Sequence, residues 1–224
     1  MLELNKIYCM DCIEGMAQFP DKYFDWCIAD PPYGIKMDKG FTGAGGFNGN
    51  GKAIGRTKYN YDYDSEKLGK DYFEEIKRIS KNFIIFGGNY YTDFFEPSNN
   101  WLIWHKHNTS PFMSDGEMAI TSSGGMKIID YVWNGLIQEN MKNKEIRTHP
   151  NQKPIGLYER IIHKYKIPPK SKIIDPFLGS GSSIIAYSNM DISFIAFEID
   201  KDIFADASKR IADHKAQMTI FEVM

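Results

Sequence analysis

Short apolar runs alternate with amphipathic segments along most of the chain, and this alternation constrains the fold more than any other feature. Runs of strand length lie at residues 6–9, 25–29, 82–86, 101–104, 127–133, 172–174 and 193–197. Apolar residues at helical spacing predict helices at 65–80, 155–165, 182–189 and 202–213, and Ser65 is suited to cap the first. Strands that alternate with helices predict an α/β fold with a mostly parallel, seven-stranded sheet.

Two irregular segments interrupt this pattern. Residues 34–60 hold eight glycines and few large aliphatic side chains, so we expect a mobile loop there. Residues 106–148 mix Ser, Asn, Gly and Met around a short β-ribbon and look like a small insertion. A length of 224 residues suits a single domain, 1–224, that carries both segments.

Composition narrows the class of protein. With 42% hydrophobic and 25% charged residues, the chain is neither disordered nor a collagen-like fibre. No apolar run is long enough for a transmembrane helix, and the first residues lack the order of a signal peptide. Three cysteines, an odd number, fit reduced thiols in the cytoplasm. Cys9 and Cys12 form a single CxxC, for which core packing is favoured over zinc binding.

The stretch Asp30-Pro31-Pro32-Tyr33-Gly34 follows the second predicted strand. Open parallel sheets bind ligands beyond the carboxyl ends of their strands. The two prolines fix φ and remove two backbone donors, so this stretch presents a carboxylate and a free carbonyl rigidly. A planar NH2 group can donate to both of these acceptors, and Tyr33 can stack on the ring that carries it. The alternative is a plain proline turn.

A second motif lies near the end of the chain, where a predicted strand leads through Asp175-Pro-Phe-Leu-Gly-Ser-Gly181 into a predicted helix. Gly179 and Gly181 allow the backbone to approach a ligand closely. Glu198 ends the next strand, where an acid can accept hydrogen bonds from ribose hydroxyls. Because Ile184 breaks the full G-x-G-x-x-G, a nucleoside without pyrophosphate is favoured. The alternative is a structural turn.

Together these two motifs resemble those of the amino-group DNA methyltransferases, which transfer a methyl group from S-adenosylmethionine to exocyclic amines of bases. The tetrapeptide precedes the glycines, as in the permuted β-type members, so the resemblance implies a circularly permuted, Rossmann-like methyltransferase fold. Residues 149–154, His-Pro-Asn-Gln-Lys-Pro, resemble the segment before the family's cofactor-side helix. Asn151 and Ser182-Ser183 stand where threonines are common in the family, and both changes keep polar groups.

The resemblance also implies roles for individual residues. Asp30, Pro31, Pro32 and Tyr33 would be catalytic. The implied cofactor-binding residues are Asp11, Cys12, Asp30, Lys153, Pro154, Asp175, Phe177, Gly179, Gly181, Ser182 and Glu198. Among them Asp11 matches the acid that holds the cofactor's adenine amine, although it is also suited to cap the following helix.

The first residue of the tetrapeptide favours one target base. Aspartate at this position resembles the adenine-N6 enzymes, whereas cytosine-N4 enzymes commonly begin with serine, so adenine is predicted and cytosine-N4 is the alternative. Methylation of RNA or of a protein amide fits less well, because those enzymes commonly begin with asparagine and place the glycines first. A non-catalytic DNA-binding or partner subunit is the alternative from another class.

Charge is distributed unevenly, although it sums to only −2. Residues 34–60 carry a local net charge of +4, and residues 142–172 carry one of +7. Each segment is either a DNA-facing surface or simply a solvated one. The predicted DNA-binding residues are Lys36, Lys39, Arg56, Lys58 and Lys106, and the predicted partner is double-stranded DNA rather than a membrane. The insertion at 106–148 is predicted to recognise the target sequence. His105 and His107 lack a neighbouring acid or cysteine cluster, so no metal is predicted. The family admits a homodimer, and a restriction endonuclease would be a separate chain.

Overall fold

The computed structural model describes residues 1–35, 67–108, 114–134, 137–146 and 152–223, with side chains of the last helix up to residue 217. By its contacts the chain divides into two compact units, Met1–Pro31 with Lys70–Met224, and Pro32–Gly69. All of the helices and strands that are described belong to the larger unit. Ser65 and nearly all of the loop predicted at 34–60 lie outside the described residues.

The larger unit is built on one eight-stranded sheet in the order β1-β10-β9-β2-β3-β5-β4-β6. Its strands are β1 (Lys6–Cys9), β2 (Phe24–Ala29), β3 (Ser80–Phe86), β4 (Trp101–His105), β5 (Gly116–Thr121), β6 (Lys127–Asp130), β9 (Lys172–Asp175) and β10 (Ser193–Glu198). A separate antiparallel pair joins β7 (Trp133–Asn134) to β8 (Ile137–Gln138). Only β5 among the eight strands runs antiparallel to its neighbours, so the predicted α/β fold with a mostly parallel sheet is confirmed.

The predicted strand count was wrong by one. The sequence analysis missed β5, whose residues Gly-Glu-Met-Ala-Ile-Thr include three that are uncommon in strands. The strand predicted at 127–133 is also interrupted, because β6 ends at Asp130 and the chain then pairs with β8 instead. Both differences fall in the part of the sheet beyond β3.

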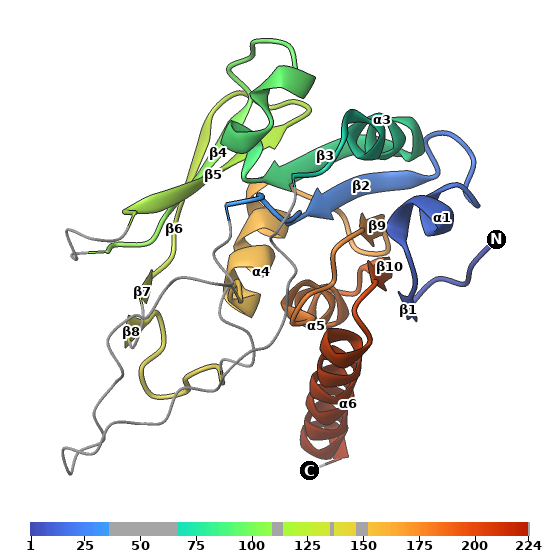
Figure 1. Ribbon diagram of the computed structural model, residues 1–224. Coiled ribbons are helices and arrows are strands. Elements are labelled where there is room, and N and C mark those ends of the chain that lie inside the picture. The colour runs from blue at the N-terminus through green and yellow to red at the C-terminus, as the bar shows by residue number, and fades with distance from the viewer. Residues whose placement is uncertain (36–66, 109–113, 135–136, 147–151, 224) are drawn as a thin grey trace. The chain divides into compact units, whose positions relative to one another are not determined.

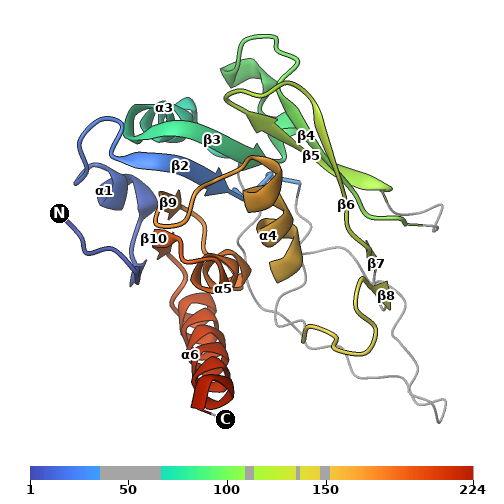
Figure 2. The same ribbon diagram turned by 180° about the vertical axis from the view of Figure 1, so that it is seen from behind.

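In the described part of the chain, α-helices flank the sheet on both faces (Figures 1 and 2). They are α1 (Cys12–Met16), α3 (Lys70–Ile79), α4 (Ile155–Lys164), α5 (Ser182–Asn189) and α6 (Lys201–Val223), with short 3-10 turns η1 (Gly88–Tyr90) and η2 (Thr92–Phe94). Helices α1 and α3 cover one face, and α4, α5 and α6 the other. Because both faces are covered, the central strands are apolar almost throughout, as in Ile173-Ile174 of β9. None of the described helices combines the length and the apolarity needed to cross a bilayer.

Helix α1 packs so closely on β10 that one position requires glycine. A Cβ atom at Gly15 would lie 2.4 Å from Cε1 of Phe197, a ring that is fully buried and cannot move aside. Replacing Gly15 by alanine is therefore expected to destabilise the fold by about 1–3 kcal/mol, read as a lower urea midpoint. Ala17→Ser, at the exposed end of α1, is the matched control and should leave the midpoint nearly unchanged. A Gly15→Ala midpoint equal to wild type would contradict this packing.

The order of strands reverses its direction between β2 and β9. From β2 the chain moves outward through β3 to β6, returns at β9 on the other side of β2, and continues away through β10. Strands β2 and β9 are therefore neighbours whose connections leave in opposite directions, which is the position where open α/β sheets bind ligands. Both sequence motifs begin at this switch point, since Asp30 follows β2 and Asp175 ends β9.

Candidate active site

Asp30 lies at the carboxyl end of β2 and forms an ion pair with a buried lysine. The ammonium of Lys153 contacts Asp30 Oδ1, and it lies 3.4 Å from Glu117 Oε2 and 4.5 Å from the centre of the Phe86 ring. The Lys153 side chain is only 6% exposed. Burial lowers the pKa of Lys153, but the carboxylates of Asp30 and Glu117 outweigh it, so the pKa lies above its ordinary value. The lysine therefore stays charged beside Asp30.

Glu117 joins this ion pair, although no sequence motif pointed to it. Because β5 runs antiparallel to β3, the start of β5 lies at the same sheet edge as the end of β2. Glu117 contacts Lys106 through Oε1, while its buried Oε2 receives no hydrogen bond within the described residues. Burial raises the pKa of Glu117, yet Lys153 and Lys106 together bring it below its ordinary value. A lone acid in an otherwise apolar strand was the signal available in the sequence.

Asp175 ends β9 as a buried carboxyl group. Its Oδ1 accepts a hydrogen bond from the backbone N–H of Phe177 at 3.0 Å, and its Oδ2 accepts one from the Ser183 hydroxyl at 2.5 Å. Burial raises the pKa of Asp175 to about 7, and the nearby charges of Asp30 and Glu198 act in the same direction. The two hydrogen bonds oppose this shift but do not cancel it.

The raised pKa of Asp175 predicts a pH dependence of stability. Since the folded-state pKa of about 7 exceeds the ordinary value of about 3.9, the folded chain holds this proton more tightly than the unfolded chain. The resulting contribution, at most about 4 kcal/mol, is fully present below pH 3.9 and is lost as the pH rises through 7. In urea unfolding from pH 4.5 to 8, Asp175→Asn is expected to remove this decline. A variant that parallels the wild-type curve would contradict the prediction.

The glycine turn after β9 leaves room for a ligand beside Gly179. Gly179 and Gly181 have φ of 50° and 76°, a region that favours glycine. A Cβ on Gly179 would meet only the Phe177 carbonyl oxygen, at 3.9 Å, whereas one on Gly181 would meet Ile211 at 3.0 Å. One glycine thus borders open space, and the other allows α6 to pack against the turn.

Acidic groups on the neighbouring strands border this turn. Glu198, at the end of β10, accepts hydrogen bonds from the backbone N–H groups of Gly179 and Asp200, each at 3.0 Å. Burial raises the pKa of Glu198. Asp11 follows β1 and caps α1, accepting from the N–H of Ile13 at 2.8 Å, so its capping role is confirmed. The carboxyl ends of β1, β10 and β9 therefore present Asp11, Glu198 and Asp175 side by side.

The remaining predicted cofactor residues lie in the same part of the larger unit. Cys12 is buried at the start of α1, while Cys9 is exposed, and the thiols of all three cysteines are free. Pro154 is the N-cap residue of α4, and Phe177 lies 6.4 Å from the ring of Tyr72. The Ser182 hydroxyl accepts a hydrogen bond from Arg210 of α6 at 2.8 Å.

Some predicted residues are not placed beside this cluster. Pro32 and Tyr33 belong to the smaller unit, where a Cβ on Gly34 would lie 2.8 Å from the backbone nitrogen of Lys67. Lys106 is directed toward Glu117 and lies over the Trp104 ring, 4.6 Å from its centre. The other predicted DNA-binding residues, Lys36, Lys39, Arg56 and Lys58, lie outside the described part of the chain.

The sheet is mostly parallel, and carboxyl groups and a glycine turn lie at its switch point. Along the chain, the Asp-Pro-Pro-Tyr motif precedes the glycine turn. This is the arrangement of the amino-group DNA methyltransferases. The chain belongs to this family, the N6/N4 DNA methyltransferases: the family model described as DNA methylase matches residues 88–209. It is 28% identical over 239 residues to the Type II methyltransferase M2.MboI of Moraxella bovis, across 91% of this chain and 86% of that protein.

Solved structures share the fold. An M1.HpyAVI–SAM complex matches with a TM-score of 0.57 and 24% identity, covering 92% of this chain and 98% of the other. The PvuII DNA methyltransferase, described as cytosine-N4-specific, matches with a TM-score of 0.55 and 14% identity, covering 93% and 90%. The Rossmann-like methyltransferase fold predicted from the motifs is confirmed by these matches.

Proposed function

We propose that this protein transfers a methyl group from S-adenosylmethionine to the exocyclic N6 amine of adenine in double-stranded DNA. The observation that carries the proposal is the position of the Asp30 carboxylate at the switch point. There it already binds a charged N–H donor, the Lys153 ammonium. An amine of the target base would make the same kind of contact. The DNA methylase family gives the class of enzyme, and the target base and the roles of the residues are what we propose.

The residues around the glycine turn fit S-adenosylmethionine. Open space borders Gly179, and carboxyl groups follow three neighbouring strands, where they can accept hydrogen bonds from an adenosine and favour a cationic centre. A complex with this cofactor is among the solved structures of the same fold. We assign Glu198 to the ribose hydroxyls and Asp11 to the adenine amine. When bound, the cofactor supplies an electrophilic methyl group on a sulfonium.

Asp30 and the Pro31 carbonyl would prepare the base for this methyl group. An aromatic amine is a weak nucleophile because its lone pair is delocalised into the ring. Hydrogen bonds from its two N–H groups to Asp30 and Pro31 favour a pyramidal nitrogen whose lone pair is available. Positioning of this kind supplies up to about 7–11 kcal/mol in well-oriented systems. Flipping the base out of the duplex costs a few kcal/mol, and stacking on Tyr33 would return about 1–3 kcal/mol.

Cytosine N4 is the second candidate target. It presents the same NH2 group, and a cytosine-N4-specific enzyme shares the fold. Adenine is favoured because the tetrapeptide begins with aspartate, as in the adenine-N6 enzymes that it resembles.

Nucleoside mass spectrometry of methylated DNA tests the proposal. Plasmid DNA incubated with the protein and S-adenosylmethionine is expected to yield N6-methyladenine, with RNA as the matched control substrate remaining unmodified. Exclusive N4-methylcytosine would reject the adenine assignment and keep the methyltransferase. Failure to modify DNA in cells that express the protein would favour a non-catalytic subunit.

A further inference from the structure

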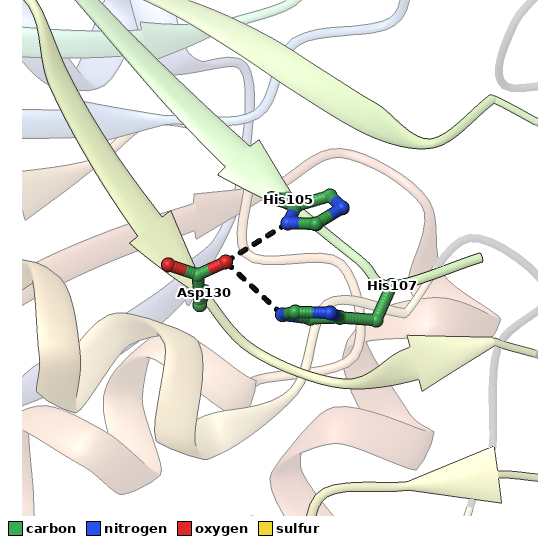
Figure 3. Close-up of side chains that lie close together, drawn as sticks. All are labelled: His105, His107 and Asp130. Atoms are coloured by element: carbon green, nitrogen blue, oxygen red, sulfur yellow. Dashed lines mark hydrogen bonds and ion pairs between the residues drawn. The ribbon is translucent and has the colours of Figure 1, made fainter.

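Two histidines and an aspartate converge at the ends of β4 and β6 (Figure 3). His105 Nδ1 lies 2.8 Å from Asp130 Oδ1, and His107 Nε2 lies 3.0 Å from the same oxygen. The two imidazole rings lie 4.0 Å apart, centre to centre. One ligand atom from each of the three residues falls within 4.8 Å of the others, so all of them are within reach of one ion.

The local fold holds these side chains together. Strands β4 and β6 are parallel, and their last residues, His105 and Asp130, are paired in register. The backbone at His107 has a φ of 53°, a left-handed conformation that is uncommon outside glycine, asparagine and aspartate. Its carbonyl is fixed by Asn134 Nδ2 at 2.9 Å, and the His105 carbonyl by the N–H of Tyr131 at 3.0 Å. The turn therefore keeps the second histidine beside the first.

We propose that His105, His107 and Asp130 form a binding site for a zinc-like divalent transition-metal ion. Imidazole nitrogens suit late first-row metals such as Zn²⁺, whereas Mg²⁺ and Ca²⁺ require mostly oxygen ligands. Two histidines, one carboxylate and a water complete a four-coordinate site. The separations of 2.8 Å and 3.0 Å between ligand atoms require only small movements to admit an ion.

Nearby charges permit this assignment. Arg160 contacts the Asp130 backbone carbonyl, but its guanidinium also pairs with Glu139 at 2.7 Å, so that carboxylate offsets its charge. His107 and Asp130 are exposed, so an ion can reach their ligand atoms from solvent.

A bound ion would tie together two strand ends. The site links β4 to β6 at the same sheet edge as Asp30, because both strands run in the direction of β2. The connection toward β5 leaves from His107, and the connection toward β7 leaves from Asp130. Metal binding would therefore stiffen the start of the insertion predicted at 106–148. This inference concerns the chain itself and stands whether or not the proposed target base is correct.

Calorimetric titration of the untagged, EDTA-dialysed protein with ZnCl2 tests the site. One Zn²⁺ per chain is expected, and excess MgCl2 should not displace it. Loss of an outer-shell group near a metal costs about 10–100-fold in affinity, so Asp130→Asn and His107→Asn should each cost at least tenfold. Asparagine tolerates the backbone at position 107, and Asp130 is exposed, so both variants are expected to fold.

Two matched controls exclude other ligands. His163→Gln changes an exposed histidine on α4, and Cys9→Ser removes the exposed thiol of the CxxC, and both should retain wild-type zinc affinity. Histidine NMR signals of His105 and His107 should shift on adding Zn²⁺. Absence of zinc binding, equal affinity in Asp130→Asn, displacement by Mg²⁺, or loss of binding in Cys9→Ser would each overturn the proposal.

Discussion

Replacing Asp30 by asparagine is expected to lower the rate of methyl transfer by at least about 10²–10³-fold, the usual cost of removing one transition-state hydrogen-bonding partner. The amide keeps the size of the carboxylate but loses its negative charge. That charge binds Lys153 and, in our proposal, the target amine. Binding of S-adenosylmethionine should be nearly unchanged, because Asp175 and Glu198 end other strands and Gly179 lies in the turn after β9. Single-turnover transfer of a tritiated methyl group, with cofactor affinity measured separately, checks both expectations.

The control for this variant is Asp213→Asn, which changes an exposed acid on α6 paired with Lys209. It should methylate DNA at the wild-type rate. Near-normal turnover in Asp30→Asn would refute the assignment of Asp30 as the catalytic acceptor. Loss of cofactor affinity together with turnover would instead point to a general disturbance of the switch point.

Replacing Lys153 by methionine is expected to destabilise the protein by about 3–5 kcal/mol at pH 7–8, because it leaves Asp30 and the buried Glu117 oxygen without their shared cation. For a chain of this size that corresponds to a fall in Tm of about 10 °C. The difference from wild type should shrink in acid, as the pH falls through the lowered native pKa of Glu117 and this carboxyl becomes protonated. Calorimetric scans of the two proteins at neutral and acid pH measure this difference in Tm.

A double variant makes this second prediction specific. Lys153→Met combined with Glu117→Gln removes the opposing charge as well, and it should recover part of the lost stability, since burying a neutral amide costs less than burying an unpaired carboxylate. Lys209→Met, which alters a lysine that is 77% exposed, is the control and should leave Tm almost unchanged. Additive losses in the double variant would mean that Lys153 and Glu117 do not interact energetically.

The inner half of the sheet could be predicted from the sequence, because its strands are continuous apolar runs. In the outer half β4 and β6 were also predicted, but β5 was not, since it mixes glycine, glutamate and alanine with only three residues typical of a buried strand. Helix ends were also displaced. The helix predicted at 202–213 continues to Val223, because Lys215, Ala216 and Gln217 are all good helix formers. The helix predicted at 65–80 is described from Lys70 to Ile79, and Ser80 instead begins β3.

The positions of the motif carboxylates were predictable from short motifs. Asp30 follows β2, and Asp175 and Glu198 end β9 and β10. Contacts between distant segments were not predictable. Glu117 reaches Lys153 only because an antiparallel strand returns to the active-site edge, and Asp130 reaches His105 only through the pairing of β4 with β6. The sequence analysis found no acid near the histidine pair, since Asp130 is 25 residues from His105 along the chain.

The hairpin of β4 and β5 has a consequence for engineering this protein. The two strands are paired up to His105 opposite Gly116, and the N–H of Lys106 continues the ladder to the Asp115 carbonyl at 2.8 Å. Both ends of the connection are thus held at one strand spacing, about 5 Å. Lengthening a loop between fixed ends costs little, about 0.6 kcal/mol per doubling. The connection is therefore an exchange point, where foreign segments can be grafted while Glu117 keeps its place beside Lys153.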